Sequence, residues 1–130
     1  MSKRAEAREV AVKLVFEYLF NNQINEQLIT DLSEEYKLDN EQQYAARVYF
    51  GVVQNMDSLS EIIKTHAVGY TYDRIFKVDK AIMLVALYEI LHEPDIDYPV
   101  SVNEAVKLAK KYSTEKSSKF INGILAKQKK

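Results

Sequence analysis

Lysines and aromatic side chains alternate near the C-terminus in a pattern suited to single-stranded RNA. Residues 101–130 contain eight lysines and only two glutamates. Two rings, Tyr112 and Phe120, flank a short segment that holds Lys116 and Lys119. Lysine ammonium groups can bind phosphates while exposed rings stack on bases. The alternative is that both rings fill the core, and the lysines then only solvate the helix faces.

The net charge of −1 conceals an uneven distribution along the chain. Residues 2–16 carry four basic and two acidic side chains, whereas residues 17–100 carry six basic and fifteen acidic ones. Two basic ends around an acidic centre predict a face that binds anions and a separate face for a basic partner. The alternative is that folding scatters these charges over the whole surface.

The sequence lacks the residue combinations typical of catalytic and metal sites. It contains no cysteine, and His66 and His92 are isolated from each other in the sequence. The three glycines are isolated, so there is no glycine-rich phosphate loop, and no serine lies in a nucleophile-elbow pattern. We therefore expect a binding protein rather than an enzyme, with no cofactor and no metal.

Length and hydropathy predict one soluble domain that spans residues 1–130. The longest apolar run, Ala81–Leu87, is far shorter than the ~18 residues that a membrane span needs. No apolar stretch follows the first charges, as it would in a secretory signal. We expect a cytoplasmic protein that does not interact with membranes.

Few glycines and prolines favour an all-α fold of about seven helices. Apolar residues recur at helical spacing over residues 4–20 and 26–36. Further helices are expected at three capping-box patterns, formed by the pairs Asp39 with Gln42, Ser58 with Glu61, and Ser101 with Glu104.

The most apolar segment is expected to form the centre of the fold. Asp79 can cap a helix that contains the seven consecutive apolar residues 81–87 and ends before Pro94. A buried parallel strand is the rival interpretation, but the length, the alanine content and the helical surroundings favour a helix. Thr114 is expected to cap the last helix, which continues through Asn122-Gly123 although that pair usually marks a turn.

Three segments resemble the NusB family of bacterial transcription antitermination factors. The strongest is PVSVNEAVKLAKKYSTEKSSKFINGIL, Pro99 to Leu125, which carries the family's Asn-Glu-Ala, Leu-Ala-Lys and Lys-Phe-Ile-Asn-Gly-Ile-Leu elements. The second is DRIFKVDKAIMLVALYEI, Asp73 to Ile90, and the third is Ala7-Arg8-Glu9 with Ala11 and Phe16. Weaker similarity joins them, so the resemblance covers nearly the whole chain.

The resemblance implies two small helical subdomains around the central buried helix. It also implies binding to boxA-type single-stranded leader RNA of ribosomal RNA operons, together with the ribosomal protein NusE, in an RNA polymerase elongation complex with other Nus factors. The RNA-binding residues expected from the basic ends and the resemblance are Lys3, Arg4, Arg8, Tyr112, Lys116, Lys119 and Phe120. Those expected to bind NusE are Phe16, Asp73, Ile75, Asp79 and Glu89.

Two alternatives remain open at this point. Similar helical domains precede the catalytic domain of some ribosomal RNA cytosine methyltransferases, so the chain could be a stand-alone relative of that domain. It could also form a homodimer that masks its RNA surface, as some family members do. The sequence departs from the family at the N-terminus, where its arginine cluster is sparser, and at Ser113, where family members often have glycine.

Overall fold

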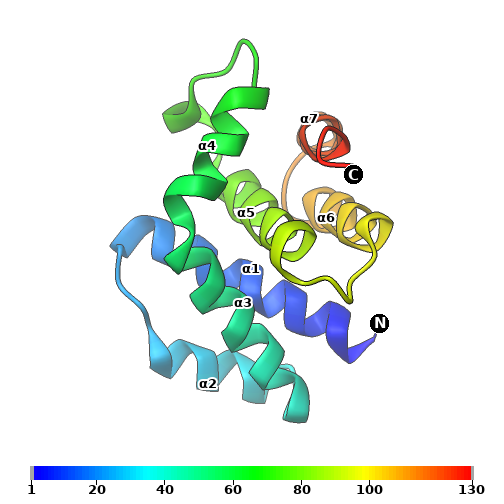
Figure 1. Cartoon of the computed structure of the whole chain (residues 1–130). Helices are drawn as coiled ribbons and strands as arrows, with labels where there is room; N and C mark the ends of the chain where they lie inside the picture. The colour runs from blue at the N-terminus through cyan, green and yellow to red at the C-terminus, as the bar shows by residue number, and fades with distance from the viewer. Residues whose placement is uncertain (1, 130) are drawn as a thin grey trace.

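The computed structural model describes residues 2–129, which form seven α-helices and two short 3-10 helices and contain no strand (Figure 1). The helices are α1 (Lys3–Asn21), α2 (Glu26–Glu35), α3 (Gln42–Gln54), α4 (Met56–His66), α5 (Lys77–His92), α6 (Tyr98–Tyr112) and α7 (Glu115–Ala126). The 3-10 helices are η1 (Asp39–Glu41) and η2 (Tyr72–Arg74). The expected all-α fold is confirmed.

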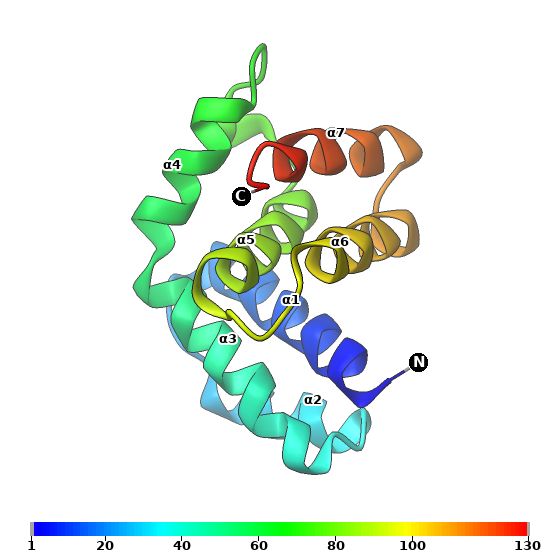
Figure 2. The ribbon, with the colours of Figure 1, turned by 45° about the vertical axis from the view of Figure 1, so that its right-hand side comes forward.

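Helix α5 occupies the centre of the molecule and joins two groups of helices. It packs against α1, α3 and α4 on one side and against α6 and α7 on the other. Figure 2 shows α6 and α7 side by side next to α5, with α1, α2 and α3 grouped below them. Every residue of α5 from Asp79 to Glu89 is buried, as the apolar run predicts. No helix within residues 2–129 is both long and apolar enough to cross a membrane.

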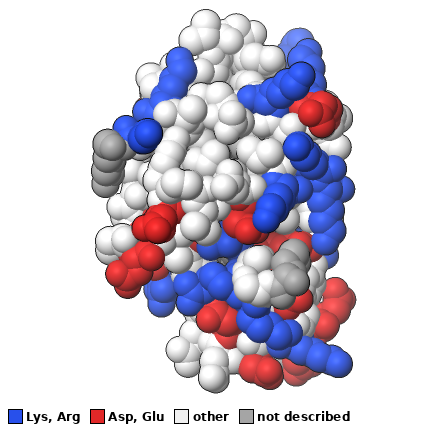
Figure 3. All heavy atoms as spheres, turned by 90° about the vertical axis from the view of Figure 1, so that its right-hand side faces the viewer, with Lys and Arg blue, Asp and Glu red and all other residues white. Residues whose placement is uncertain are grey.

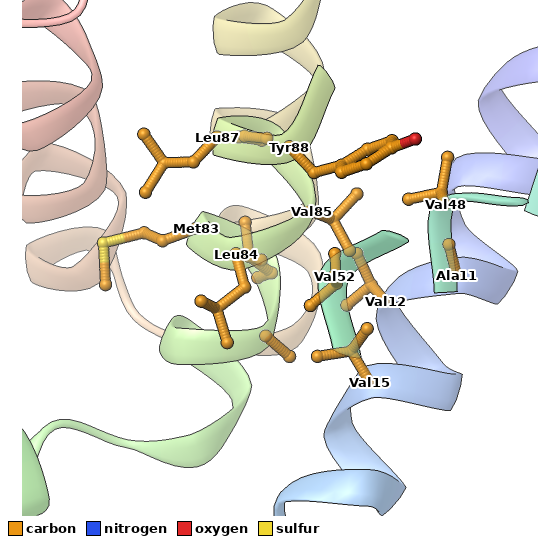
Figure 4. Packing of buried hydrophobic residues seen from close by; sticks show 14 of the residues in the cluster. Ala11, Val12, Val15, Val48, Val52, Met83, Leu84, Val85, Leu87 and Tyr88 are labelled. Carbon is orange, nitrogen blue, oxygen red and sulfur yellow. The ribbon is translucent and has the colours of Figure 1, made fainter. Parts of the chain in front are cut away.

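Branched aliphatic side chains of α1, α3 and α5 interlock in the core (Figure 4). Val12 and Val15 of α1 lie close to Val52 of α3 and to Leu84 and Val85 of α5 in this view, and all five are buried. Burying one such side chain stabilises a fold by about 1.5–3 kcal/mol. The α1–α5 contact therefore provides a rigid base for side chains on the outer face of α1.

Three predicted helix starts are wrong, because the polar side chains concerned find other partners. Helix α5 begins two residues before Asp79, which instead accepts a hydrogen bond from Ser117 Oγ at 2.7 Å. Helix α6 begins at Tyr98, so Ser101 lies inside it and donates to Glu89. Ser58 lies inside α4 and donates to the carbonyl of Asn55.

Other predicted boundaries are confirmed. Thr114 caps α7, because its side-chain oxygen accepts from the Ser117 backbone N–H at 2.9 Å. Helix α7 continues through Asn122-Gly123, where its stripe of apolar residues is buried. The capping box predicted for Asp39 with Gln42 is wrong, because Asp39 begins the 3-10 helix η1 with a φ of 53° and forms no side-chain cap. Helix α3 begins at Gln42 without a side-chain cap.

Candidate functional site

Arg8 and Glu89, expected on binding surfaces, form an ion pair in the core instead. Their exposed fractions are 3% and 0%, and Arg8 Nε lies 2.8 Å from both carboxylate oxygens of Glu89. Tyr44 and Ser101 donate hydroxyl hydrogen bonds to the same carboxylate. Burial and the nearby Glu89 raise the pKa of Tyr44, which keeps this donor protonated. The pair ties α1 to α3, α5 and α6, so the expectation that both residues lie at the surface is corrected.

Tyr112 lies at the surface, held there by a carboxylate that the sequence analysis did not select. The Tyr112 hydroxyl donates to Glu9, which also accepts from Tyr36 at 2.8 Å and from Lys111 Nζ at 3.0 Å. Burial alone would raise the pKa of Glu9, but these three hydrogen bonds outweigh burial and lower it. Tyr112 is 39% exposed, and these contacts fix the orientation of its ring.

Two lysines surround the Tyr112 ring. Lys111 Nζ lies 5.2 Å from the ring centre and Lys13 Nζ lies 5.8 Å from it. Neither was among the residues expected to bind RNA, although their charge and their position on the faces of α1 and α6 could have indicated them. A fixed ring beside two ammonium groups is suited to a stacked base with its flanking phosphates.

A basic face lies along α6 and α7. Lys107 and Lys110 of α6 and Lys119 of α7 line a shallow depression of about 430 Å³, together with Asn103, Glu115 and three further residues. In Figure 3, which shows the side where α6, α7 and the N-terminus lie, lysine and arginine side chains gather in several clusters with acidic residues between them. Within residues 2–129, Lys110 and Lys119 form no ion pair, so both can bind phosphates.

The N-terminal residues Lys3 and Arg4 are engaged within the protein. Lys3 Nζ lies 3.1 Å from both Glu6 Oε2 and the Tyr36 carbonyl oxygen, but most of its side chain is exposed. Arg4 donates two hydrogen bonds to Glu41 and stacks on Tyr44, with its guanidinium carbon 3.9 Å from the ring centre. A phosphate would have to compete with these contacts, most strongly at Arg4.

Phe120 and Lys116, expected to bind RNA, share a pocket with Asp79 and Ile75, expected to bind NusE. This pocket has a volume of about 200 Å³ and lies between the η2 region, the start of α5 and the start of α7. Phe120 is half-buried, and its ring centre lies 4.5 Å from that of Tyr70. The structure therefore joins two groups of residues that the sequence analysis had assigned to different partners.

A larger apolar groove of about 720 Å³ lies next to this pocket, between α1 and the segment from η2 into α5. Phe20 and Phe76 line it with exposed fractions of 59% and 60%, as do Phe16 and Ile75 from the expected partner surface. Asp73 is exposed in η2, at the edge of this segment. The charged residues that line the groove are Lys13, Arg74 and Lys77. The groove is thus lined by cations, whereas the sequence predicts an acidic surface for the partner.

The sequence matches one protein family over nearly its whole length. Residues 5–130 match the model of the NusB family. The chain belongs to the NusB family. It is 41% identical to the transcription antitermination protein NusB of Acetivibrio thermocellus, over 98% of this chain and 88% of that protein.

Solved NusB structures share the fold. The T. maritima NusB structure superimposes with a TM-score of 0.82 at 28% identity, covering 98% of this chain and 90% of that one. The crystal structure of the antitermination factors NusB and NusE in complex with dsRNA gives a TM-score of 0.86 at 23% identity, covering 98% and 96%. The seven-helix arrangement around α5 is therefore the NusB fold.

In this NusB-family chain, the matched C-terminal motif serves both the core and the surface. Ile121 and Leu125 are buried against the core, whereas Lys119 and Asn122 are exposed on the basic face. Ala7 and Arg8 of the N-terminal motif are also buried. Family motifs thus identify the fold, but individual motif positions have to be assigned to a surface from their exposure.

Proposed function

We propose that this protein is a transcription antitermination factor that binds boxA-type single-stranded leader RNA together with the ribosomal protein NusE. It acts in the cytoplasm, as one domain, within the RNA polymerase elongation complex and with other Nus factors. Its activity is binding rather than catalysis. The observation that carries the proposal is that the exposed Tyr112, with Lys13 and Lys111 close to its ring, lines the apolar groove on α1.

The basic face suits an RNA strand. Tyr112 supplies a stacking surface, and Lys13, Lys110 and Lys119 supply ammonium groups on three different helices. Single-stranded RNA is bound by this combination of exposed rings and cations, because stacking tolerates many bases while the charges follow the backbone. Lys3 and Lys116 extend the same surface, and Arg8 supports it only from within the core.

The apolar groove suits a protein partner. Aromatic side chains as exposed as Phe20 and Phe76 are typical of interface anchors, which contribute most of the binding energy when a partner covers them. We assign this groove to NusE, with Phe16 and Ile75 in its lining and Asp73 at its rim. Because Tyr112 also lines the groove, RNA and partner are expected to bind next to each other.

Fluorescence anisotropy with a labelled boxA-type leader RNA tests the RNA surface. The double variant Lys110→Gln with Lys119→Gln should bind the RNA more weakly. The slope of log K against log salt concentration should become shallower by about 0.7 for each phosphate contact that is lost. Lys37→Gln with Lys64→Gln removes the same charge from the α2–α3 connection and from α4, so it serves as the matched control. Equal losses in both double variants would show that only net charge matters and would contradict this surface.

The Tyr112 ring is tested separately from its hydroxyl group. Tyr112→Ala should weaken RNA binding by about 1–3 kcal/mol if the ring stacks on a base. Tyr112→Phe keeps the ring and loses only the hydrogen bond to Glu9, so its affinity should stay close to that of the wild type. Wild-type affinity in the alanine variant would exclude stacking at this position.

A further inference from the structure

We propose that the shallow depression between α6 and α7 selects RNA over DNA, with Asn103 and Asn122 binding the ribose 2′-hydroxyl group. The inference rests on the proposed RNA-binding function and adds a preference for the sugar to it. This α6–α7 depression has a volume of about 430 Å³. None of its lining residues lines the apolar groove on α1 or the pocket beside Phe120, so it is a surface separate from both.

Two stripes of side chains, one from each helix, form the walls of the α6–α7 depression. The α6 residues are at positions 103, 106, 107 and 110, and the α7 residues are at positions 115, 118, 119 and 122. This spacing places each set on one face of its helix. Figure 2 shows the chain running along α6 and returning along α7 in the opposite direction. Asn103 and Asn122 therefore lie at the same end of the depression, and Lys110 and Glu115 lie at the end near the connection.

The charges of the depression attract a phosphate backbone. Lys107, Lys110 and Lys119 line it against one carboxylate, that of Glu115. Lys107 Nζ lies 3.7 Å from a carboxylate oxygen of Glu104, but 74% of the Lys107 side chain remains exposed. Ammonium groups bind phosphate oxygens and release the counterions of the strand. The excess of lysines thus favours a strand of nucleic acid, without distinguishing RNA from DNA.

The depression offers no surface on which a base can stack. No aromatic side chain lines it, and Tyr112 and Phe120 line the groove and the pocket outside it. Proteins hold the bases of a single strand mainly by stacking them on rings. The strand is therefore expected to place its sugar–phosphate backbone in the depression and to direct its bases away from it. Contacts of this kind position a strand without reading its sequence.

Two carboxamides face this backbone. Asn103 and Asn122 are both exposed, and each side chain carries an oxygen acceptor besides its N–H donors. Phosphate oxygens can accept from the amide N–H groups, but they cannot donate to the amide oxygens. Within an RNA backbone the 2′-hydroxyl group is the only hydrogen-bond donor, and DNA lacks it. The two carboxamides thus favour RNA through a contact that does not depend on the base.

The test compares three fluorescein-labelled strands of one boxA-type leader sequence, made as RNA, as 2′-deoxy strand with deoxyuridine, and as 2′-fluoro strand. The fluoro group keeps an RNA-like sugar conformation but cannot donate a hydrogen bond. By anisotropy, the wild-type protein should bind the RNA about tenfold more tightly than either other strand, as expected for two neutral hydrogen bonds. Equal affinities for the RNA and the 2′-fluoro strand would overturn the inference, and this comparison needs no variant to fold.

Asn103→Leu with Asn122→Leu provides the second arm, because it removes both carboxamides at similar volume. This double variant should bind the RNA about tenfold more weakly than the wild type. It should keep the wild-type affinity for the deoxy strand, which also shows that it is folded. Gln43→Leu with Gln54→Leu removes two exposed carboxamides from α3 and should keep the full preference for RNA. A preference for RNA retained in the asparagine variant would overturn the assignment of these residues.

Two further outcomes separate this inference from the proposed function. If the wild-type protein binds all three strands alike and Lys110→Gln with Lys119→Gln weakens each of them, the 2′-hydroxyl assignment is wrong while the RNA surface stands. If the asparagine variant loses affinity for NusE and keeps its preference for RNA, the depression receives a protein segment instead. Both results contradict the inference, and only a failure of the wild-type protein to bind the leader RNA contradicts the proposed function as well.

Discussion

Arg8 of α1 and Glu89 of α5 form a buried ion pair in which the guanidinium Nε lies 2.8 Å from both carboxylate oxygens. Tyr44 of α3 and Ser101 of α6 donate hydrogen bonds to the same Glu89 carboxylate. One carboxylate thus connects four helices. The binding surface depends on this network because it fixes α1 relative to α6.

Removing one member of this pair should destabilise the fold severely. Arg8→Ala leaves the Glu89 carboxylate buried without its counter-ion, which costs about 3–5 kcal/mol in comparable cases. Arg4→Ala is the matched control, because it breaks a partly exposed ion pair with Glu41 that is worth about 0–1 kcal/mol. Chemical denaturation measures both free energies of unfolding. Similar small losses in the two variants would contradict the assigned role of Arg8.

Two glycines in helices should respond to alanine in opposite directions. A Cβ at Gly51 of α3 would collide with the buried ring of Tyr88 of α5, so Gly51→Ala should cost about 1–3 kcal/mol by overpacking. A Cβ at Gly123 of α7 would meet open space. Gly123→Ala should therefore stabilise the protein by about 0.5–1 kcal/mol through helix propensity. Thermal unfolding of both variants measures these changes in stability. If Gly123→Ala unfolded at a lower temperature than the wild type, the open space described around Gly123 would be wrong.

The stabilisation provided by Glu9 should depend on pH. Hydrogen bonds from Tyr112, Lys111 and Tyr36 outweigh burial and lower the pKa of Glu9 below its ordinary value of 4.5. The ionised form therefore favours the folded state, and its contribution is present above pH 4.5 and lost as the pH falls through the lower folded-state pKa.

Glu9→Gln should consequently be less stable than the wild type near neutral pH, and the difference should shrink in acid. Free energies of unfolding at a series of pH values measure this trend. Glu61→Gln removes an exposed carboxylate on α4 and controls for the loss of one negative charge. A difference between wild type and Glu9→Gln that stays constant down to strongly acidic pH would show that Glu9 acts only through packing.

The helices could be predicted from the sequence because apolar spacing records which faces are buried. The run within α5 and the stripe on α7 were identified in this way, and the structure confirms both. The residues at which helices begin were harder to predict, because a capping pattern does not show whether the polar side chain instead forms a hydrogen bond with a residue on another helix. Ser101 and Asp79 were both predicted to cap the start of their own helix, but each forms a hydrogen bond with another helix instead.

The surface residues could be predicted only in part, for a related reason. Arg8 and Lys3 look alike in a basic N-terminal segment, but one is buried against Glu89 and the other is exposed. Their difference depends on a carboxylate 81 residues away along the chain. Glu9 was missed for the same reason, because its importance comes from Tyr36 and Tyr112, which only the packing of three helices brings together.

The apolar groove should contribute most of the affinity for NusE. Phe76→Ala removes a ring that is 60% exposed in the free protein, so it should accelerate dissociation of the partner while leaving the fold intact. Phe50→Ala removes an exposed ring of α3 that does not line the groove, and it serves as the control. Surface plasmon resonance gives both rates. Equal rates of NusE dissociation from the two variants would show that the partner binds elsewhere. Loss of self-association in Phe76→Ala alone would instead identify the groove as a homodimer interface.

We propose that RNA and NusE bind to adjoining surfaces at Tyr112, and a thermodynamic cycle tests this arrangement most directly. Isothermal titration gives the affinity for boxA-type RNA in the free protein and in its NusE complex, and the affinity for NusE with and without RNA. Each ligand should strengthen binding of the other by the same amount, on the order of 1–3 kcal/mol, and Tyr112→Ala should reduce this coupling. Identical RNA affinities with and without NusE, or coupling unchanged in Tyr112→Ala, would contradict the account.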